Sequence, residues 1–325
     1  MSIKSSLQLL LLTAALSVGV TPLPTAAAEK SVRVTAIVEH PALDAVRQGI
    51  LDELEQRGYH AGGNLDWEFQ SAQGDSGIAA QIARKFVGDA PDAIVAIATP
   101  SAQSVAAAAR GSLPVIFAAV TDPVDAKLVK QWQRPGGNIT GVSDLLPLEK
   151  HMALVREIVP AARTIGIPYN PGEANAAVLV KRIEAMAPAL GVNIVTASAP
   201  TTGDVLAATR SLVGRVDAIY VTTDNTVISA FESVLKVGRD AQIPVIAGDT
   251  DTVARGAIAA VGFDYYDVGR QTGTILVRVL EGEQPGAIAV QGVDKTKLHL
   301  NPKSAHDMGV QLAPALLARA SKIID

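Results

Sequence analysis

Cysteine is absent from this chain of 325 residues, and aromatic residues make up only 4% of it. The lack of cysteine excludes disulfides, thiolate nucleophiles and zinc or iron–sulfur sites with cysteine ligands. No cluster of lysine and arginine is present, and the formal net charge is −4, so we expect no nucleic-acid partner. The hydrophobic share of 48% supports a sizeable core and excludes wholesale disorder.

Motifs of common enzyme and cofactor sites are also missing. The sequence contains no G-x-G-x-x-G, no G-x-x-x-x-G-K-[ST] and no G-x-S-x-G. Gly141-Val142-Ser143 begins the last of these, but Leu145 stands where glycine is needed. The five histidines form no H-x-x-x-H pair. We therefore predict no catalytic residue, no metal site and no cofactor.

Long apolar runs are confined to the start of the chain. Lys4 precedes a mostly apolar stretch from Leu7 to Val20, and Ala26-Ala27-Ala28 provides small residues for cleavage. This pattern predicts a secretory signal peptide over residues 1–28, because the run is short for a transmembrane helix. An N-terminal membrane anchor is the alternative. No cysteine follows the run, which excludes a lipid-anchored form, so we expect a soluble periplasmic protein.

Predicted strands and helices alternate from Ser31 onward, which is typical of an α/β sheet. Buried strands are indicated by short runs of apolar and β-branched residues, and helices by apolar residues at helical spacing. The predicted strands are Val32–Val38, Trp67–Gln70, Ala93–Ala98, Val115–Val120, Thr164–Tyr169, Val192–Thr196, Ala218–Val221 and Val245–Ala247. The predicted helices are Ala42–Arg57, Ile78–Val87, Ser101–Arg110, Met152–Val159, Ala174–Leu190, Val205–Val213 and Val227–Gly238.

The alternation pauses at the turn-rich segment Gln131–Asn138 and then restarts, which indicates two lobes of similar design. The last third is less regular. There we expect strands at Ala257–Phe263 and Ala287–Val290 and helices at Val268–Leu280 and Leu312–Ile324. Such late pieces can cross back between the lobes and form a hinge that closes around a ligand.

The predicted fold is therefore α/β, with two doubly wound Rossmann-like lobes joined by a multi-strand hinge. We expect lobe 1 to comprise residues 31–143 plus 257–285, lobe 2 residues 144–256 plus 286–325, and a ligand cleft between them.

Polar residues gather at the predicted strand-to-helix junctions, where ligands bind in open α/β sheets. Thr99-Pro100-Ser101 is the clearest junction. Thr99 is a good helix N-cap and Pro100 suits the first helical position. The free N–H groups at this positive end of the helix dipole favour an anion such as a carboxylate. Plain helix capping is the alternative.

Carboxylates at the same level provide the opposite charge. Asp122, Asp224, Asp249 and Asp264 lie near such strand ends. N–H groups on one side and a carboxylate on the other suit the zwitterion of an α-amino acid, because charge-assisted hydrogen bonds fix its orientation. Aromatic rings that can stack on a flat side chain, or else pack in the core, are Phe117, Tyr169, Phe263, Tyr265 and Tyr266.

Several longer strings occur in a characteristic order along the chain. They include Glu39-His40-Pro41-Ala42-Leu43-Asp44, Ala72-Gln73-Gly74-Asp75, Ala119-Val120-Thr121-Asp122-Pro123, Tyr169-Asn170-Pro171-Gly172-Glu173-Ala174-Asn175, Thr223-Asp224-Asn225-Thr226-Val227 and Phe263-Asp264-Tyr265-Tyr266-Asp267-Val268-Gly269. The ordered set covers nearly the whole chain after the predicted signal peptide. It resembles the substrate-binding proteins of ABC transporters, of the tryptophan/tyrosine-binding type.

The resemblance implies a type I periplasmic-binding fold with three crossovers and a ligand, an aromatic amino acid, between the lobes. It implies that the cleft walls carry His40, Gln73, Thr99, Ser101, Thr121, Asp122, Tyr169, Asn175, Asp224, Asn225 and Asp249. The chain departs from the family at Thr222, where proline is common, and at the positions after Gly248-Asp249. Both departures flank the expected pocket.

We therefore expect an exported, monomeric solute receptor that works with an ABC permease in the membrane and performs no chemistry on its ligand. Asp224→Ala and Thr99→Ala are each expected to weaken ligand binding by about 1–3 kcal/mol. Two alternatives are a ligand sensor of the same fold that signals to a membrane protein, and a periplasmic hydrolase that uses carboxylates in the cleft.

Overall fold

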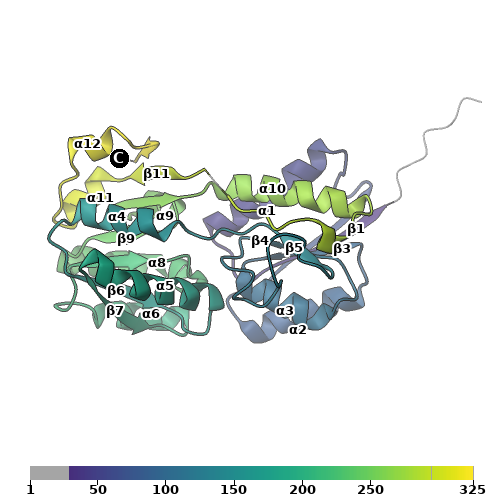
Figure 1. Ribbon diagram of the computed structural model, residues 1–325, viewed down its shortest axis with the longest axis horizontal. Coiled ribbons are helices and arrows are strands. Elements are labelled where there is room, and N and C mark those ends of the chain that lie inside the picture. Colours follow the sequence, from purple (N-terminus) through teal and green to yellow (C-terminus); the bar gives the residue numbers. More distant parts are fainter. Residues whose placement is uncertain (1–28, 294, 325) are drawn as a thin grey trace, which may run out of the picture.

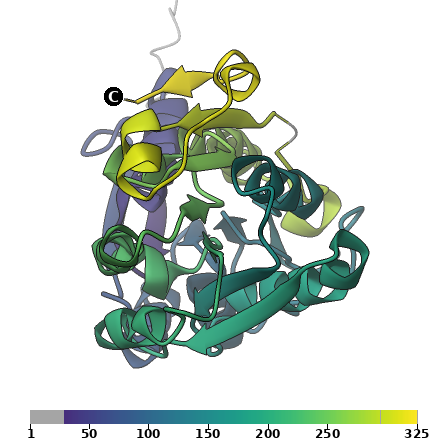
Figure 2. The same cartoon turned by 90° about the vertical axis from the view of Figure 1, so that its left-hand side faces the viewer.

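The structure is a computed structural model that describes residues 29–293 and 295–324. The predicted signal peptide lies outside the described residues. The chain forms two α/β lobes that lie side by side along the long axis of the molecule (Figure 1). Each lobe has its own sheet, and the view from the second lobe shows helices on both sides of that lobe's sheet (Figure 2).

The first lobe contains a five-stranded parallel sheet in the order β2-β1-β3-β4-β5. Its strands are β1 (Lys30–Ala36), β2 (Leu65–Ser71), β3 (Ala93–Ile97), β4 (Val115–Ala118) and β5 (Ile139–Gly141). Its helices are α1 (Pro41–Gln56), α2 (Ser76–Gly88), α3 (Thr99–Ala109) and α10 (Tyr265–Leu280), followed by the short η2 (Pro285–Ala287). Strands β3 and β4 are buried at every residue, as expected for the centre of a parallel sheet covered on both faces.

The second lobe contains a seven-stranded sheet in the order β12-β11-β10-β9-β8-β6-β7, in which only the β10–β11 pair is antiparallel. Its strands are β6 (Thr164–Tyr169), β7 (Asn193–Ser198), β8 (Ala218–Val221), β9 (Val245–Ala247), β10 (Ala259–Gly262), β11 (Lys297–Leu300) and β12 (Lys322–Ile323). Its helical elements are α4 (Leu148–Ile158), α5 (Ala174–Leu190), η1 (Thr202–Asp204), α6 (Val205–Arg210), α7 (Asn225–Ser229), α8 (Phe231–Ala241), α9 (Asp251–Arg255), α11 (Pro302–Asp307) and α12 (Pro314–Leu317).

The chain crosses between the lobes three times: between β5 and α4, between β10 and α10, and between η2 and β11. The first and third crossovers run together, because the Ser143 N–H donates to the Gln291 carbonyl oxygen at 2.8 Å and the Gln291 N–H donates to the Gly141 carbonyl oxygen at 3.0 Å. The lobes are thus joined by connecting segments that lie next to each other, an arrangement that permits hinge closure.

Two parts of the expected organisation were wrong. Residues 257–262 do not belong to lobe 1, because β10 pairs with β9 and β11 in the second sheet. Residues 286–291 do not belong to lobe 2, because Ile288 accepts a hydrogen bond from Thr140 and the Val290 N–H donates to the Trp132 carbonyl oxygen. The predicted closing helix over Leu312–Ile324 is also wrong: the segment forms only α12 and the edge strand β12.

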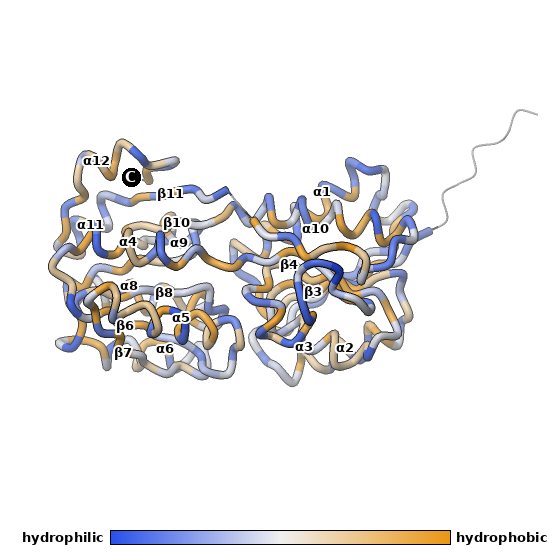
Figure 3. The backbone as a smooth tube through the Cα atoms, in the orientation of Figure 1, coloured by the Kyte–Doolittle hydropathy of each residue, from blue (hydrophilic) through white to orange (hydrophobic). Residues whose placement is uncertain are grey.

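Helices α1 and α10 pack closely although they are far apart in the sequence. A Cβ atom on Gly49 of α1 would overlap the Tyr266 carbonyl oxygen, and one on Gly269 of α10 would overlap the Val46 carbonyl oxygen. Glycine at these two positions therefore lets the helix backbones touch. Hydrophobic stretches fill both lobes, and hydrophilic stretches lie along the outer loops (Figure 3).

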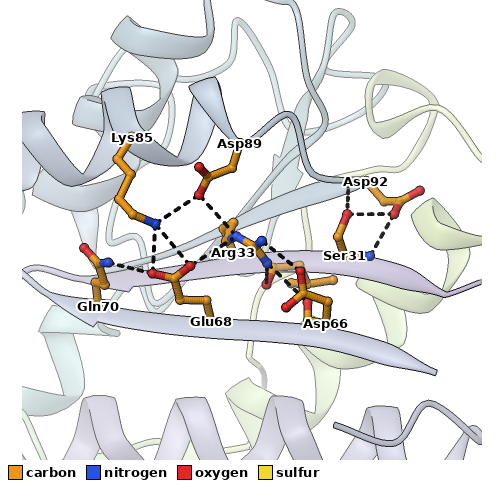
Figure 4. A network of polar contacts seen from close by, with 9 residues as sticks. Ser31, Arg33, Asp66, Glu68, Gln70, Lys85, Asp89 and Asp92 are labelled. Atoms are coloured by element: carbon orange, nitrogen blue, oxygen red, sulfur yellow. Dashed lines mark hydrogen bonds and ion pairs between the residues drawn. The ribbon is translucent and has the colours of Figure 1, made fainter. Parts of the chain in front are cut away.

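An ionic network joins α2 to the outer part of the first sheet (Figure 4). Arg33 of β1 pairs with Asp66 of β2 at 2.8 Å, and Lys85 of α2 pairs with Glu68 of β2 at 2.9 Å and with Asp89 at 3.1 Å. The network ties the C-terminal end of α2 to strands β1 and β2.

Candidate functional site

A small enclosed cavity lies between the two lobes, at the carboxyl ends of their parallel strands. We call it the interlobe cavity. Its lining consists of His40, Leu43, Ala98, Thr99, Ala119, Thr121, Asp144, Asn175, Thr223, Asn225, Ile228, Asp249 and Tyr265. The cavity volume is about 20 Å³, which is room for little more than a water molecule. The lobes are therefore closed, and the lining side chains have to move apart before the cavity can hold a larger solute.

The first lobe contributes the N-terminus of α3 to the interlobe cavity. Ala98 and Ala119, at the ends of β3 and β4, have φ angles of 73° and 53°. Such positive φ values are strained for residues other than glycine and occur where the surrounding structure imposes them, often at functional sites. They turn the chain so that Thr99 and Thr121 face the cavity. The first-turn N–H groups of α3 provide the positive end of a helix dipole at this wall.

Several polar atoms that line the interlobe cavity are buried and have no hydrogen-bond partner among the described residues. They are His40 Nδ1, Thr99 Oγ1, Asn175 Oδ1 and Thr223 Oγ1. Buried polar groups are almost always paired, so unpaired groups clustered around one cavity need an explanation. A polar solute that bridges the lobes would satisfy them, because His40 and Thr99 belong to the first lobe and Asn175 and Thr223 to the second.

The part of the cavity nearest the hinge is acidic. Asp144, on the first crossover, accepts hydrogen bonds from Tyr265 Oη at 2.8 Å and from Thr121 Oγ1 at 3.2 Å. Asp249 follows β9 and accepts from the Asp251 N–H at 2.9 Å. Burial raises the pKa of both carboxyls, that of Asp249 to about 7 with a further contribution from Asp251. A cationic group placed between them would lower both pKa values and stabilise the ionised carboxylates.

His40 precedes α1 and faces the same cavity from the first lobe. Burial lowers the pKa of its imidazole to about 4, so the ring is neutral at pH 7. A neutral imidazole with an unpartnered Nδ1 can donate to or accept from a neutral polar group of a solute.

A second pair of buried acids, Glu173 and Asp224, stabilises a loop beside the cavity. Glu173 accepts hydrogen bonds from the N–H groups of Asn225 and Thr226 at 3.1 and 2.9 Å. Asp224 caps α7 by accepting from the Val227 N–H at 2.9 Å and also accepts from the Asn170 N–H at 2.6 Å. Burial and the nearby Glu173 raise the pKa of Asp224 well above its usual value. These acids hold the loop that presents Thr223 and Asn225 to the cavity.

Most of the residues predicted from the sequence to form the cleft wall do lie at the interlobe cavity: His40, Thr99, Thr121, Asn175, Asn225 and Asp249. The others lie elsewhere. Gln73 lines a second groove between the lobes and donates to Glu39 at 3.1 Å, Asp122 pairs with Arg182, and Asp224 caps α7. Ser101 is buried outside the lining, and Tyr169 packs at the edge of the core.

Of the aromatic residues considered for stacking, only Tyr265 lines the interlobe cavity. Phe117 and Phe263 are buried in the core, and Tyr266 donates to Asp52 at 2.8 Å. Asp264, considered for an ammonium group, pairs instead with Lys297 at 2.6 Å.

Sequence reasoning missed Asp144, which lies on a crossover between lobes. The only available signal was its place directly after Gly141-Val142-Ser143, a string that is informative only once the crossover is known.

None of the helices in residues 29–293 and 295–324 has both the length and the apolar character to cross a membrane. Within the same ranges no group of three histidines or acidic residues is arranged to hold a metal ion.

Comparison with known proteins places this cavity in context. The family described as "ABC transporter substrate binding protein" matches residues 31–324. A tyrosine-binding protein from Clostridioides difficile is 39% identical over 283 residues, which is 87% of this chain and 82% of that protein. The match confirms the resemblance seen in the sequence and identifies a family of solute-binding proteins rather than enzymes. Such proteins bind a small molecule, work with an ABC permease and are typically extracytoplasmic.

Two solved structures confirm the type I periplasmic-binding fold. They also allow the arrangement of the lobes in this chain to be compared with that in two relatives. An ABC domain from Streptococcus pneumoniae in complex with L-Trp is 34% identical, with a TM-score of 0.88, over 91% of this chain and 100% of that one. The ligand-free, open structure of a substrate-binding protein from Clostridium difficile is 38% identical, with a TM-score of 0.67, over 90% of this chain and 98% of that one. At similar identity and coverage, the lobes here thus match the arrangement of the L-Trp complex better than the open one.

Proposed function

We propose, given that this chain belongs to the ABC transporter substrate-binding protein family, that it is an exported periplasmic receptor that delivers an aromatic amino acid to an ABC importer. The observation that carries the proposal is the set of buried, unpartnered polar atoms around the interlobe cavity, together with two buried carboxyls at its hinge end. The relatives named for tyrosine and crystallised with L-Trp support the choice of ligand class.

The charges of the lining favour one orientation of a zwitterion. The ammonium group would lie at the hinge between Asp144 and Asp249, where both carboxyls gain an ion-pair partner. The carboxylate would lie at the N-terminus of α3 beside Thr99, at the positive end of the helix dipole. The side chain would then pack on Leu43 and Ile228, with Tyr265 as the aromatic neighbour. Removal from water on closure strengthens each of these contacts.

Thermal unfolding of residues 29–325 with a panel of amino acids tests the proposal. At 100 times its Kd a ligand adds about 2.7 kcal/mol of stability, which raises Tm by several degrees. We expect shifts with L-tyrosine or L-tryptophan. N-acetyl-L-tryptophan, which lacks the ammonium charge, is expected to give no shift. Size-exclusion chromatography of the same sample is expected to show a monomer.

Variants separate this orientation from unspecific binding. Asp144→Asn is expected to abolish the shift with L-tryptophan, whereas Asp240→Asn, an exposed acid of α8 that pairs with Lys236, is expected to leave it unchanged. A panel without any shift would contradict the ligand class. Equal shifts with L-tryptophan and its N-acetyl derivative would contradict the role of the two carboxyls.

A further inference from the structure

We infer that the ion pair between Asp122 and Arg182 is a latch that holds the two lobes in the closed arrangement. Asp122 follows β4 in the first lobe, and Arg182 projects from α5 in the second. In residues 29–293 and 295–324, this is the only ion pair that joins the lobes away from the crossovers. Separation of the lobes therefore has to break it, whereas every other ion pair can persist through the motion.

The acidic half of the latch is held rigidly in place. The Asp122 side chain is 10% exposed, and its Oδ1 accepts from the N–H groups of Val124 and Asp125 at 3.1 and 3.0 Å. These bonds aim the other oxygen, Oδ2, at the Arg182 guanidinium. A carboxylate fixed in this way loses little side-chain entropy when the pair forms.

The basic half is exposed enough to let the latch open. The Arg182 side chain is 43% exposed, so water can solvate the guanidinium when the lobes separate. Ion pairs with exposed partners have small net free energies and weaken as salt is added. A weak, reversible pair suits a receptor that has to release its solute, because a strong one would trap the closed state.

Both halves are connected to the interlobe cavity. Asp122 directly follows Thr121, which lines the cavity, and Arg182 lies seven residues after Asn175, which also lines it. Seven residues are two helical turns, so Asn175 and Arg182 lie on the same side of α5. The movement that brings Asn175 towards a solute therefore also brings Arg182 towards Asp122. Asp122 thus serves closure, not direct contact with the solute as the resemblance implied.

The absence of cysteine in the chain allows a direct test, because two introduced cysteines can be spin-labelled selectively. Gln81→Cys on α2 and Ala207→Cys on α6 place one label on the exposed surface of each lobe. Without added solute, we expect the distance between labels to lengthen when salt is raised from 20 to 500 mM. In the Arg182→Gln variant, we expect the long distance at both salt concentrations. Identical distance distributions in the two proteins at low salt would overturn the latch.

Dissociation kinetics supply the second readout, with L-tryptophan as probe. Arg182→Gln and Asp122→Asn are each expected to raise its dissociation rate about two- to tenfold. The double variant is expected to match the single variants, since both remove the same contact. Lys181→Gln and Asp125→Asn, exposed neighbours of the two latch residues, serve as controls and are expected to behave like the wild type.

The two readouts separate the latch from the proposed function. Only the kinetic test depends on the proposed ligand, because the distance measurement uses no solute. Additive effects of the two substitutions on the dissociation rate would contradict a direct pair. If L-tryptophan does not bind at all, the proposed function fails, while the distance measurement without solute still decides the latch. Arg182→Gln lies on an exposed helix face and spares the N–H groups that Asp122 binds, so it tests the latch even if Asp122→Asn impairs folding.

Discussion

At the scale of single residues, Thr99 combines two properties that rarely occur together in a core. Its side chain is 1% exposed, and its hydroxyl has no partner within the described residues. Thr99→Val keeps the shape and removes the hydroxyl. We expect binding of L-tryptophan to weaken by about 1–3 kcal/mol, the cost of leaving a buried polar group unpaired, while the free energy of unfolding without ligand stays the same or rises. Isothermal titration and urea unfolding measure the two quantities, and unchanged affinity would exclude a solute contact at Thr99.

Asp249 makes stability depend on pH in a specific direction. Its pKa is raised to about 7 in the folded protein and is near 3.9 in an unfolded chain. Below pH 3.9 both states hold the proton, so the carboxyl has no effect; as pH rises towards 7, only the unfolded state loses the proton readily. The wild type should therefore lose stability relative to Asp249→Asn by up to about 1.4 kcal/mol per pH unit between pH 4 and 7, and no more above it.

Urea unfolding of both proteins at pH 4.5, 6 and 8 measures this difference. Asparagine keeps an oxygen for the hydrogen bond from the Asp251 N–H, so the comparison isolates the charge. A difference in stability that does not change with pH would show that Asp249 titrates normally.

Prediction at the residue scale succeeded where a residue stands directly at a strand end. Thr99, Thr121 and Asp249 lie at the interlobe cavity, because parallel strands bring their carboxyl ends to one edge of the sheet. Asp122 and Asp224 stand at equally good positions but point to Arg182 and to the α7 N-terminus. Which partner a carboxylate takes depends on side chains from distant segments, and the spacing of residues carries no information on that.

At the scale of secondary-structure elements, the contact between α1 and α10 depends on glycine. Gly269→Ala would place a methyl group against the Val46 carbonyl, and overpacking of this kind costs about 1–3 kcal/mol. Gly88→Ala, at the end of α2 where a Cβ meets no atom within 4 Å, is the matched control and is expected to be neutral or slightly stabilising. Urea unfolding distinguishes the two, and equal effects would contradict close packing of α1 on α10.

Elements were predictable from sequence where an apolar run lies between two layers. The buried strands β3 and β8 and the long helices α1 and α5 fall within or close to their expected ranges, since their periodicity reflects burial. The expected helix over Leu312–Ile324 failed because Ser321 and Ile324 bond to Leu298 and Leu300 of β11. Pairing with a distant strand overrides local helical spacing.

At the scale of the whole molecule, closure should appear as a change of shape. The lobes here are arranged as in the L-Trp complex of a relative and differ from the open structure of another. If the ligand-free protein populates an open arrangement in solution, L-tryptophan is expected to reduce its radius of gyration in small-angle X-ray scattering, because the ligand favours the state that contacts it from both lobes. Glycine at the same concentration is the control. An unchanged radius of gyration when calorimetry shows saturation would contradict closure on binding.

The interleaved course of the chain also bears on how such a protein is made. Helix α10, which covers α1, comes more than 200 residues after it, and the hydrogen bond from Tyr266 to Asp52 joins residues 214 positions apart. The second sheet is likewise incomplete until β11 has been added. A polypeptide that emerges amino end first therefore cannot finish either lobe until synthesis is almost over. Contacts of such long sequence separation also form slowly. Late completion leaves the nascent chain without a finished lobe, and a chain without a finished lobe can still pass through a narrow channel.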